Sequence, residues 1–135
     1  MERMTSGRAA NLAGVNVETL RYYERRGLLP KPKRTASNYR ICDEEAVLRI
    51  RFVKRAQELG FTLAEIKELL SLRATRGARC ADVRKRAEVK IREIEQKIRG
   101  LEAMKSALAA LVAGCSGRGP LKECAILDAL GEEEP

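Results

Sequence analysis

The sequence predicts a mainly α-helical chain with a winged helix-turn-helix head, a long helix that pairs antiparallel with a second copy as a coiled coil, and a C-terminal cysteine-bearing loop. Three observations predict this fold. Short segments in residues 1–73 are bounded by N-cap residues and glycines. An apolar heptad pattern runs over about four heptads within residues 80–113. Residues 114–135 carry two cysteines in a stretch interrupted by glycine and proline.

The positive charge is concentrated in the first part of the chain. Residues 1–60 hold 13 Lys/Arg against 7 Asp/Glu, whereas the chain as a whole carries +8. This asymmetry suggests a polyanion-binding head joined to a separate partner or sensor part, with a solvated basic surface as the competing interpretation. No stretch approaches the roughly 18 apolar residues of a membrane span. The N-terminus also lacks the apolar core of a signal peptide, so we expect a cytoplasmic protein with no membrane partner.

The head should begin with two short helices. Residues 7–13 fit a helix, and Asn16 is a good N-cap for a second helix over 17–26. Two short helices joined by three residues make a helix-turn-helix, whose second helix enters the major groove of double-stranded DNA. Two prolines then break the helical pattern, and a short β-leaning stretch predicts a hairpin wing within residues 29–42.

The second helix and the wing carry the candidate DNA-binding side chains. Arg21 and Arg25 stand one helical turn apart and can reach base edges or phosphates, and tyrosine hydroxyls can donate to phosphate oxygens. The helix candidates are Val17, Glu18, Thr19, Arg21, Tyr22, Tyr23 and Arg25, and the wing candidates are Lys33, Arg34, Asn38, Tyr39 and Arg40. Any one basic residue here is explained equally well as a solvated charge. Their concentration on a helix and a wing favours DNA.

Two more helices should complete the head, and a longer one should follow. Asp43 caps a helix over 44–58, and a capping box from Thr62 to Glu65 opens the next helix. From about residue 82 to 112 the a and d positions are Arg84, Ala87, Ile91, Ile94, Ile98, Leu101, Lys105, Leu108 and Val112, with charged residues such as Lys90 between them. A helix of about 45 Å exceeds what a small head can cover, so we expect it to form a homodimeric coiled coil.

The cysteines are the candidate metal-binding or redox-active residues of this sequence. The four cysteines are Cys42, Cys80, Cys115 and Cys124, and there is no histidine. In a reducing compartment such thiols indicate metal or redox chemistry before disulfides. The absence of histidine excludes a Ser-His or Cys-His catalytic pair, and no acid–base constellation or phosphate loop suggests an enzyme. Cys42, at the end of the wing, is interpreted as an apolar residue of the head's core.

The other three cysteines predict a metal site shared by two chains. Cys80 lies just before the long helix, whereas Cys115 and Cys124 lie beyond its other end. They can meet only if two chains run antiparallel, so that one subunit supplies Cys80 and the other supplies the remaining two. Three thiolates without histidine favour a soft ion: Hg(II) or Pb(II) suits three sulfurs, whereas Zn²⁺ usually takes four ligands. The competing interpretation is that these are ordinary buried cysteines.

Three segments of the sequence closely resemble the signature of the MerR family of transcription regulators. They are residues 13–30 (AGVNVETLRYYERRGLLP), 38–41 (NYRI) and 52–70 (FVKRAQELGFTLAEIKELL). The resemblance implies a winged-helix head, an antiparallel dimerisation helix and a C-terminal effector loop. It also implies a dimer that represses a promoter and then activates it for RNA polymerase, because effector binding makes the dimer bend and untwist the DNA.

The cysteine pattern is similar to that of the thiol-dependent metal sensors of this family. The resemblance implies a mercuric-resistance type of regulator with Hg(II) as effector, and Pb(II) or Cd(II) as the alternatives. A thiol redox or electrophile sensor on the same scaffold, reacting at Cys80 or Cys42, is a second hypothesis. A third is a metal-buffering protein with no promoter role, against which the helix-turn-helix residues argue.

Overall fold

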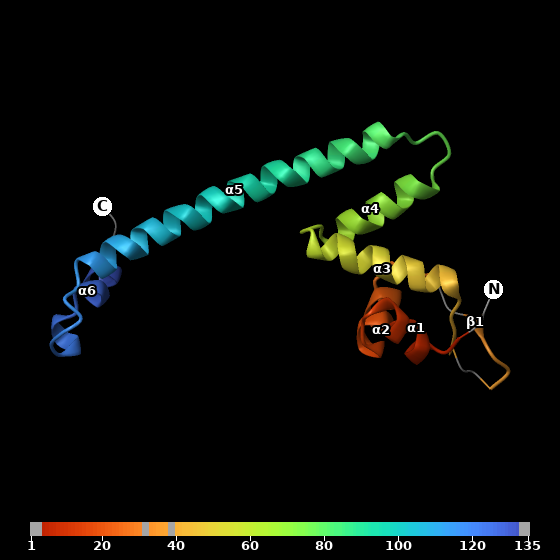
Figure 1. Cartoon of the computed structure of the whole chain (residues 1–135), viewed down its shortest axis with the longest axis horizontal. Helices are drawn as coiled ribbons and strands as arrows, with labels where there is room; N and C mark the ends of the chain where they lie inside the picture. Colours follow the sequence, from red (N-terminus) through yellow and green to blue (C-terminus); the bar gives the residue numbers. More distant parts are fainter. Residues whose placement is uncertain (1–3, 31–32, 38–39, 133–135) are drawn as a thin grey trace. The chain divides into compact units, whose positions relative to one another are not determined.

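The computed structural model describes residues 4–30, 33–37 and 40–132. Two compact units divide the chain, Met1–Lys90 and Ile91–Pro135. The elements shown in Figure 1 are the helices α1 (Ser6–Ala13), α2 (Val17–Arg25), α3 (Glu44–Glu58), α4 (Leu63–Ala74), α5 (Cys80–Ala113) and α6 (Ala125–Gly131), the strands β1 (Lys33–Arg34) and β2 (Arg40–Ile41), and a short 3-10 helix η1 (Leu121–Glu123). The predicted mainly helical fold class is confirmed.

A tight turn of three residues joins α1 to α2. Gly14 ends α1 in the left-handed region at φ +75°, where a side chain would be strained, and its N–H bonds back to the carbonyls of Ala10 and Asn11. Asn16 begins α2 as predicted, because its side chain accepts a hydrogen bond of 2.7 Å from the N–H of Thr19. The helix-turn-helix is therefore fixed by local caps at both ends of the turn.

The predicted wing is a two-stranded antiparallel sheet. Lys33 pairs with Ile41, and Arg34 pairs with Arg40. Beyond the strands, Met4 and Cys42 exchange backbone hydrogen bonds of 2.8 and 2.7 Å, so the start of the chain extends the base of the wing. Cys42 is buried in the core of the head, where the sequence predicts it.

Helix α3 crosses α1 in the head, and the core lies where these helices meet α2 and α4 (Figure 1). The largest fully buried side chains are Leu20, Leu28, Ile50, Val53 and Ile66. Burial of each such side chain stabilises the fold by roughly 1.5–3 kcal/mol. These residues come from α2, the segment after it, α3 and α4, so one continuous core holds α2 in place.

The start of α5 differs slightly from the prediction. The helix begins at Cys80, so this cysteine lies in the first turn and not before the helix. The physical reason is a capping interaction, in which the Asp82 carboxylate accepts a hydrogen bond of 2.9 Å from the backbone N–H of Arg79. Helix α4 also extends to Ala74, which leaves a connection of only five residues, 75–79.

Most of α5 is uncovered in the single chain. Among its described residues only Lys90 is buried. The predicted apolar seam is exposed at Ile91, Ile94, Ile98, Leu101, Leu108 and Val112, each with more than a third of its surface accessible. Within the described ranges, no helix combines the length and the apolar character that crossing a membrane requires. Helix α5 therefore presents an apolar stripe along an otherwise charged surface.

Candidate DNA interface and thiol sites

The outward face of α2 carries two arginines held by neighbours on the same helix. Arg21 forms an exposed ion pair with Glu18, at 3.2 Å between the guanidinium and the carboxylate. The guanidinium carbon of Arg25 lies 6.0 Å from the centre of the Tyr22 ring, which is itself 40% exposed. Such contacts are individually weak at a surface. Both arginines thus remain available to a polyanion.

Tyr23 points into the head, whereas its neighbour Tyr22 is exposed. The Tyr23 side chain is buried, and its hydroxyl donates a hydrogen bond of 2.7 Å to Oε1 of Gln57 on α3. Burial raises the pKa of Tyr23, and the negative charge of Glu58 adds to the effect. The sequence predicts that this hydroxyl donates to phosphate. The structure instead uses it to anchor α2 to α3, because the helical period turns position 23 towards the core.

The remaining DNA-binding candidates lie at the start of α2 and on the wing. Val17 is partly buried against the core, and the hydroxyl of Thr19 donates to Asn16 Oδ1 at 2.9 Å. On the wing, Lys33 and Arg34 are exposed. The predicted contacts at Asn38 and Tyr39, and that of the Arg40 side chain, lie outside the described part of the chain.

Two cations that the sequence analysis did not single out reinforce the turn before α2. From α3, Arg51 donates a hydrogen bond of 2.7 Å to the Leu12 carbonyl, and Lys54 donates one of the same length to the Gly14 carbonyl. Positive groups at a helix C-terminus satisfy carbonyls that the helix leaves unpaired. No sequence signal identifies these pairs, because their partners lie 39 and 40 residues away.

Cys80 lies exposed beside an apolar groove in the first unit. The groove has a volume of about 600 Å³, and its lining includes Cys80 itself. Apolar side chains around it include Phe52, Ala56, Leu59, Leu69, Leu72 and Val83. The thiol is thus reachable from outside and has a largely apolar surface beside it.

The second unit carries the other two candidate ligands. Cys115 and Cys124 are both free and partly exposed. The backbone N–H of Gly117 donates to the Cys115 sulfur at 3.4 Å, and Gly117 adopts φ +73°. Glycine is suited to this left-handed conformation, which accompanies the approach of the amide to the sulfur. Cys124 stands at the N-cap position of α6.

Within one chain, the described residues contain no cluster of three His, Cys, Asp or Glu side chains placed to hold a metal ion. Cys80 belongs to the first unit, and the other two candidates belong to the second. Cys42 differs from all three, because it is buried and its sulfur lies 3.9 Å from the Ser6 hydroxyl. The three accessible thiols are a donor set suited to a soft ion.

A partly buried ion pair between α4 and α5 was not predicted from the sequence. Lys90 stands among charged positions of the heptad, yet its side chain is only 7% exposed and its ammonium lies 2.8 Å from Glu65 Oε1. The hydrogen bond from Lys90, followed by that from the Thr62 backbone, lowers the pKa of Glu65 to about 2. The capping-box pattern predicts the role of Glu65 at the start of α4, but no pattern in the sequence predicts its contact with Lys90.

A winged helix-turn-helix with outward arginines, followed by a long helix with an exposed apolar seam and accessible thiols, defines a DNA-binding regulator with an effector part. The chain belongs to the MerR family. The family model described as "MerR HTH family regulatory protein" matches residues 4–73, and the model described as "MerR, DNA binding" matches residues 47–111.

Curated relatives and solved structures cover nearly the whole chain. The mercuric resistance operon regulatory protein of Serratia marcescens is 43% identical over 136 residues, which span 100% of this chain and 93% of the relative. The lead(II) complex of the transcription regulator PbrR691 from Ralstonia metallidurans CH34 has a TM-score of 0.85 at 34% identity, covering 95% of this chain and 99% of that one. The mercury(II) complex of MerR from Bacillus megaterium MB1 has a TM-score of 0.74 at 37% identity, covering 96% and 100%.

Proposed function

We propose that this protein is a Hg(II)-responsive transcription regulator that binds promoter DNA as a homodimer. The observation that carries the proposal is the placement of its thiols. Cys80 is accessible in the first turn of α5, and Cys115 and Cys124 follow the last turn of the same helix. Thiolate ligands without histidine suit a soft metal ion, and they require the reduced state that a cytoplasmic location provides.

The proposed metal site draws on both subunits. Helix α5 has 34 residues, which at 1.5 Å per residue is a span of about 50 Å. One ion therefore cannot reach both ends of α5 in a single chain. An antiparallel pairing along the exposed seam would bring Cys80 of one subunit to Cys115 and Cys124 of the other. When bound, the metal would link the two subunits through sulfur.

The named relatives support Hg(II) as the effector, with Pb(II) and Cd(II) as the alternatives. The 43% identical relative is named as a mercuric resistance regulator, and the 37% identical structure holds mercury(II). Pb(II) is the second candidate, because the structure with the TM-score of 0.85 is a lead(II) complex. Three thiolates can bind either ion, so direct competition between the two ions decides between them. Cd(II) is included in the same competition.

The proposed DNA interface combines α2 with the wing. We assign the contacts to Glu18, Arg21, Tyr22 and Arg25 on the exposed face of α2, with Val17 and Thr19 at its first turn, and to Lys33 and Arg34 on β1. Asn38, Tyr39 and Arg40 complete the proposed wing contacts. Tyr23 is left out because its hydroxyl is bonded to Gln57. Metal binding would then change how the dimer distorts the promoter for RNA polymerase.

Replacing Arg21 by alanine is expected to weaken promoter binding and to leave metal binding unchanged. An arginine that reads a guanine contributes about 1–3 kcal/mol, which corresponds to a loss of roughly 5- to 150-fold in affinity. Binding is measured by fluorescence anisotropy at fixed salt, with Arg99→Ala on the exposed part of α5 as the charge-matched control. Equal promoter affinity for Arg21→Ala and the control would remove α2 from the interface.

The metal proposal is tested by titrating reduced dimer with Hg(II) in excess small thiol. We expect the wild-type dimer to retain Hg(II) with a thiolate-to-metal absorption band, and Cys80→Ala to lose the metal to the competitor, because two thiolates hold the ion less firmly against it. Cys42→Ala, which removes the buried thiol, is the control and should retain the metal. Release of Hg(II) from the wild type would refute the mercury assignment and move Pb(II) and Cd(II) forward.

A further inference from the structure

Lys90 attaches α5 to the head through polar contacts that are shielded from solvent. It is the one buried residue among the described residues of that helix, and its ammonium lies 2.8 Å from Glu65 Oε1 and 5.5 Å from the centre of the Phe61 ring. A buried ammonium is costly unless it is paired. The contacts with the carboxylate and the aromatic face supply that compensation.

The carboxylate that holds Lys90 also begins helix α4. Oε1 of Glu65 accepts a hydrogen bond of 2.8 Å from the backbone N–H of Thr62, and the Thr62 hydroxyl accepts one from the backbone of Glu65. The same oxygen therefore serves the capping box and the ion pair. If α5 shifts at Lys90, it acts directly on the first turn of α4.

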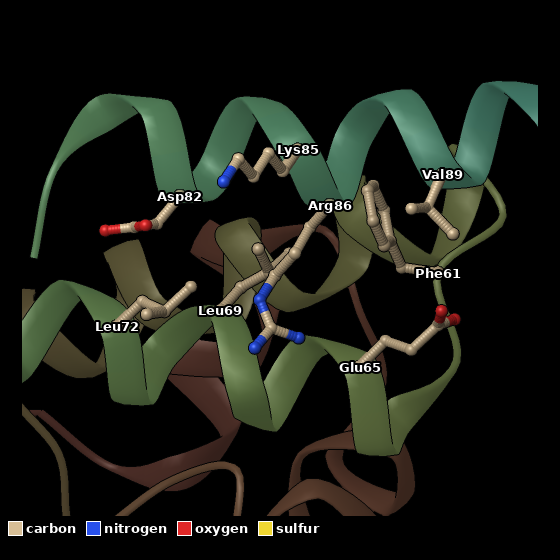
Figure 2. Close-up of a pocket in the computed structure, with 8 residues that line it drawn as sticks. All are labelled: Phe61, Glu65, Leu69, Leu72, Asp82, Lys85, Arg86 and Val89. Atoms are coloured by element: carbon tan, nitrogen blue, oxygen red, sulfur yellow. The ribbon is translucent and has the colours of Figure 1, made fainter.

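The other attachments between α4 and α5 are more open. Arg86 pairs with Glu68, but both side chains are about half exposed, so solvent screens the pair. Between the two helices lies a pocket of about 380 Å³, and Figure 2 shows Arg86 extending from α5 towards α4, with Val89 of α5 beside Phe61. Of these two ion pairs between α4 and α5, Glu65–Lys90 is therefore the one more shielded from solvent.

A short series of contacts leads from this pair to α2. Thr62 follows directly on the turn that ends α3, and Phe61 in that turn contacts the Lys90 ammonium. In the last turn of α3, Gln57 accepts the hydrogen bond from Tyr23 on α2. Networks of packed side chains and hydrogen bonds of this kind can couple separate sites.

We infer that the Glu65–Lys90 pair is a positioning pair that transmits metal occupancy at Cys80 to the DNA-binding helix α2. Cys80 and Lys90 both belong to α5 and lie ten residues apart, which is about 15 Å of continuous helix. A metal that displaces the start of α5 would therefore move Lys90 with it. The inference rests on the proposed metal function. It adds the contacts through which a displacement of α5 on metal binding would reach the head.

The test replaces Lys90 by leucine and follows amide hydrogen exchange with and without Hg(II). Leucine is chosen over methionine because a thioether binds soft metals. Removing one partner of a buried ion pair usually destabilises a protein, but the Glu65 side chain is a third exposed and keeps its hydrogen bond from the Thr62 N–H, so solvent compensates part of the loss. Thermal melting checks that the variant folds. Lys90→Arg keeps the charge, and Lys97→Leu makes the same substitution at an exposed position of α5.

In the wild type, Hg(II) should change exchange both in residues 80–90 and in α2. Lys90→Leu should keep the change in residues 80–90 and lose most of the change in α2, whereas Lys90→Arg and Lys97→Leu should behave as the wild type. An undiminished α2 response in Lys90→Leu, or failure of Lys90→Arg to restore it, would overturn the inference. A wild type without any response at 80–90 would instead refute the metal proposal, and this inference with it.

Discussion

A heterodimer that combines one Cys80→Ala subunit with one Cys124→Ala subunit is expected to retain Hg(II), although neither parent homodimer does so against a competing thiol. In the antiparallel arrangement, the Cys124→Ala subunit still supplies Cys80, and its Cys80→Ala partner still supplies Cys115 and Cys124. One complete site is therefore rebuilt from two defective chains. The second site of the same dimer carries both lesions.

Two affinity tags, one on each variant, allow the heterodimer to be purified after co-expression and its metal to be measured per dimer. The shared site predicts at most one Hg(II) per heterodimer. If each chain supplied all three thiolates to its own ion, every site in the heterodimer would be damaged and none would retain metal. A heterodimer as empty as its parents would therefore exclude a site shared between subunits.

Replacing Leu101 by glutamate is expected to dissociate the dimer at micromolar concentration. Leu101 is 62% exposed in the single chain and occupies a d position of the apolar seam. Burying an unpaired carboxylate at that position costs several kcal/mol, which is comparable with the free energy that holds many dimers together. Sedimentation equilibrium measures the change directly.

The control for this variant is Arg99→Gln, which makes the same change in net charge at an exposed position off the seam. We expect the control to remain dimeric and Leu101→Glu to become monomeric while retaining its helical head. The monomer should also fail to retain Hg(II), because one chain cannot complete the shared site. A dimeric Leu101→Glu would place the subunit interface elsewhere than on this seam.

Local signals predicted the elements of the head well. The Asn16 cap, the capping box at Thr62 and Glu65, and the Asp43 cap are each made between residues three positions apart. Such contacts depend only on nearby backbone, so a sequence pattern specifies them. The seven-residue repeat of apolar positions likewise predicted the exposed seam of α5.

Tertiary contacts could not be predicted in this way. Tyr23 and Tyr22 are adjacent and chemically identical, but only Tyr23 meets Gln57, which lies 34 residues away. Lys90 resembles the other charged residues of α5, and its burial depends on Glu65, 25 residues earlier. These outcomes are decided by which elements pack together. The same applies to the roles of Arg51 and Lys54 at the end of α1.

The double use of the Glu65 carboxylate makes the contact between α4 and α5 resistant to acid. The folded-state pKa of Glu65 is about 2, against an ordinary value of 4.5. A carboxyl group with a lowered pKa contributes stability that is fully present above its unfolded value and is lost as the pH falls towards its folded value. Protons therefore begin to weaken this contact only below about pH 4.5 and remove it near pH 2. Ordinary variation in cellular acidity therefore leaves the charge on Glu65 unchanged, and pH would not act as a switch at this contact.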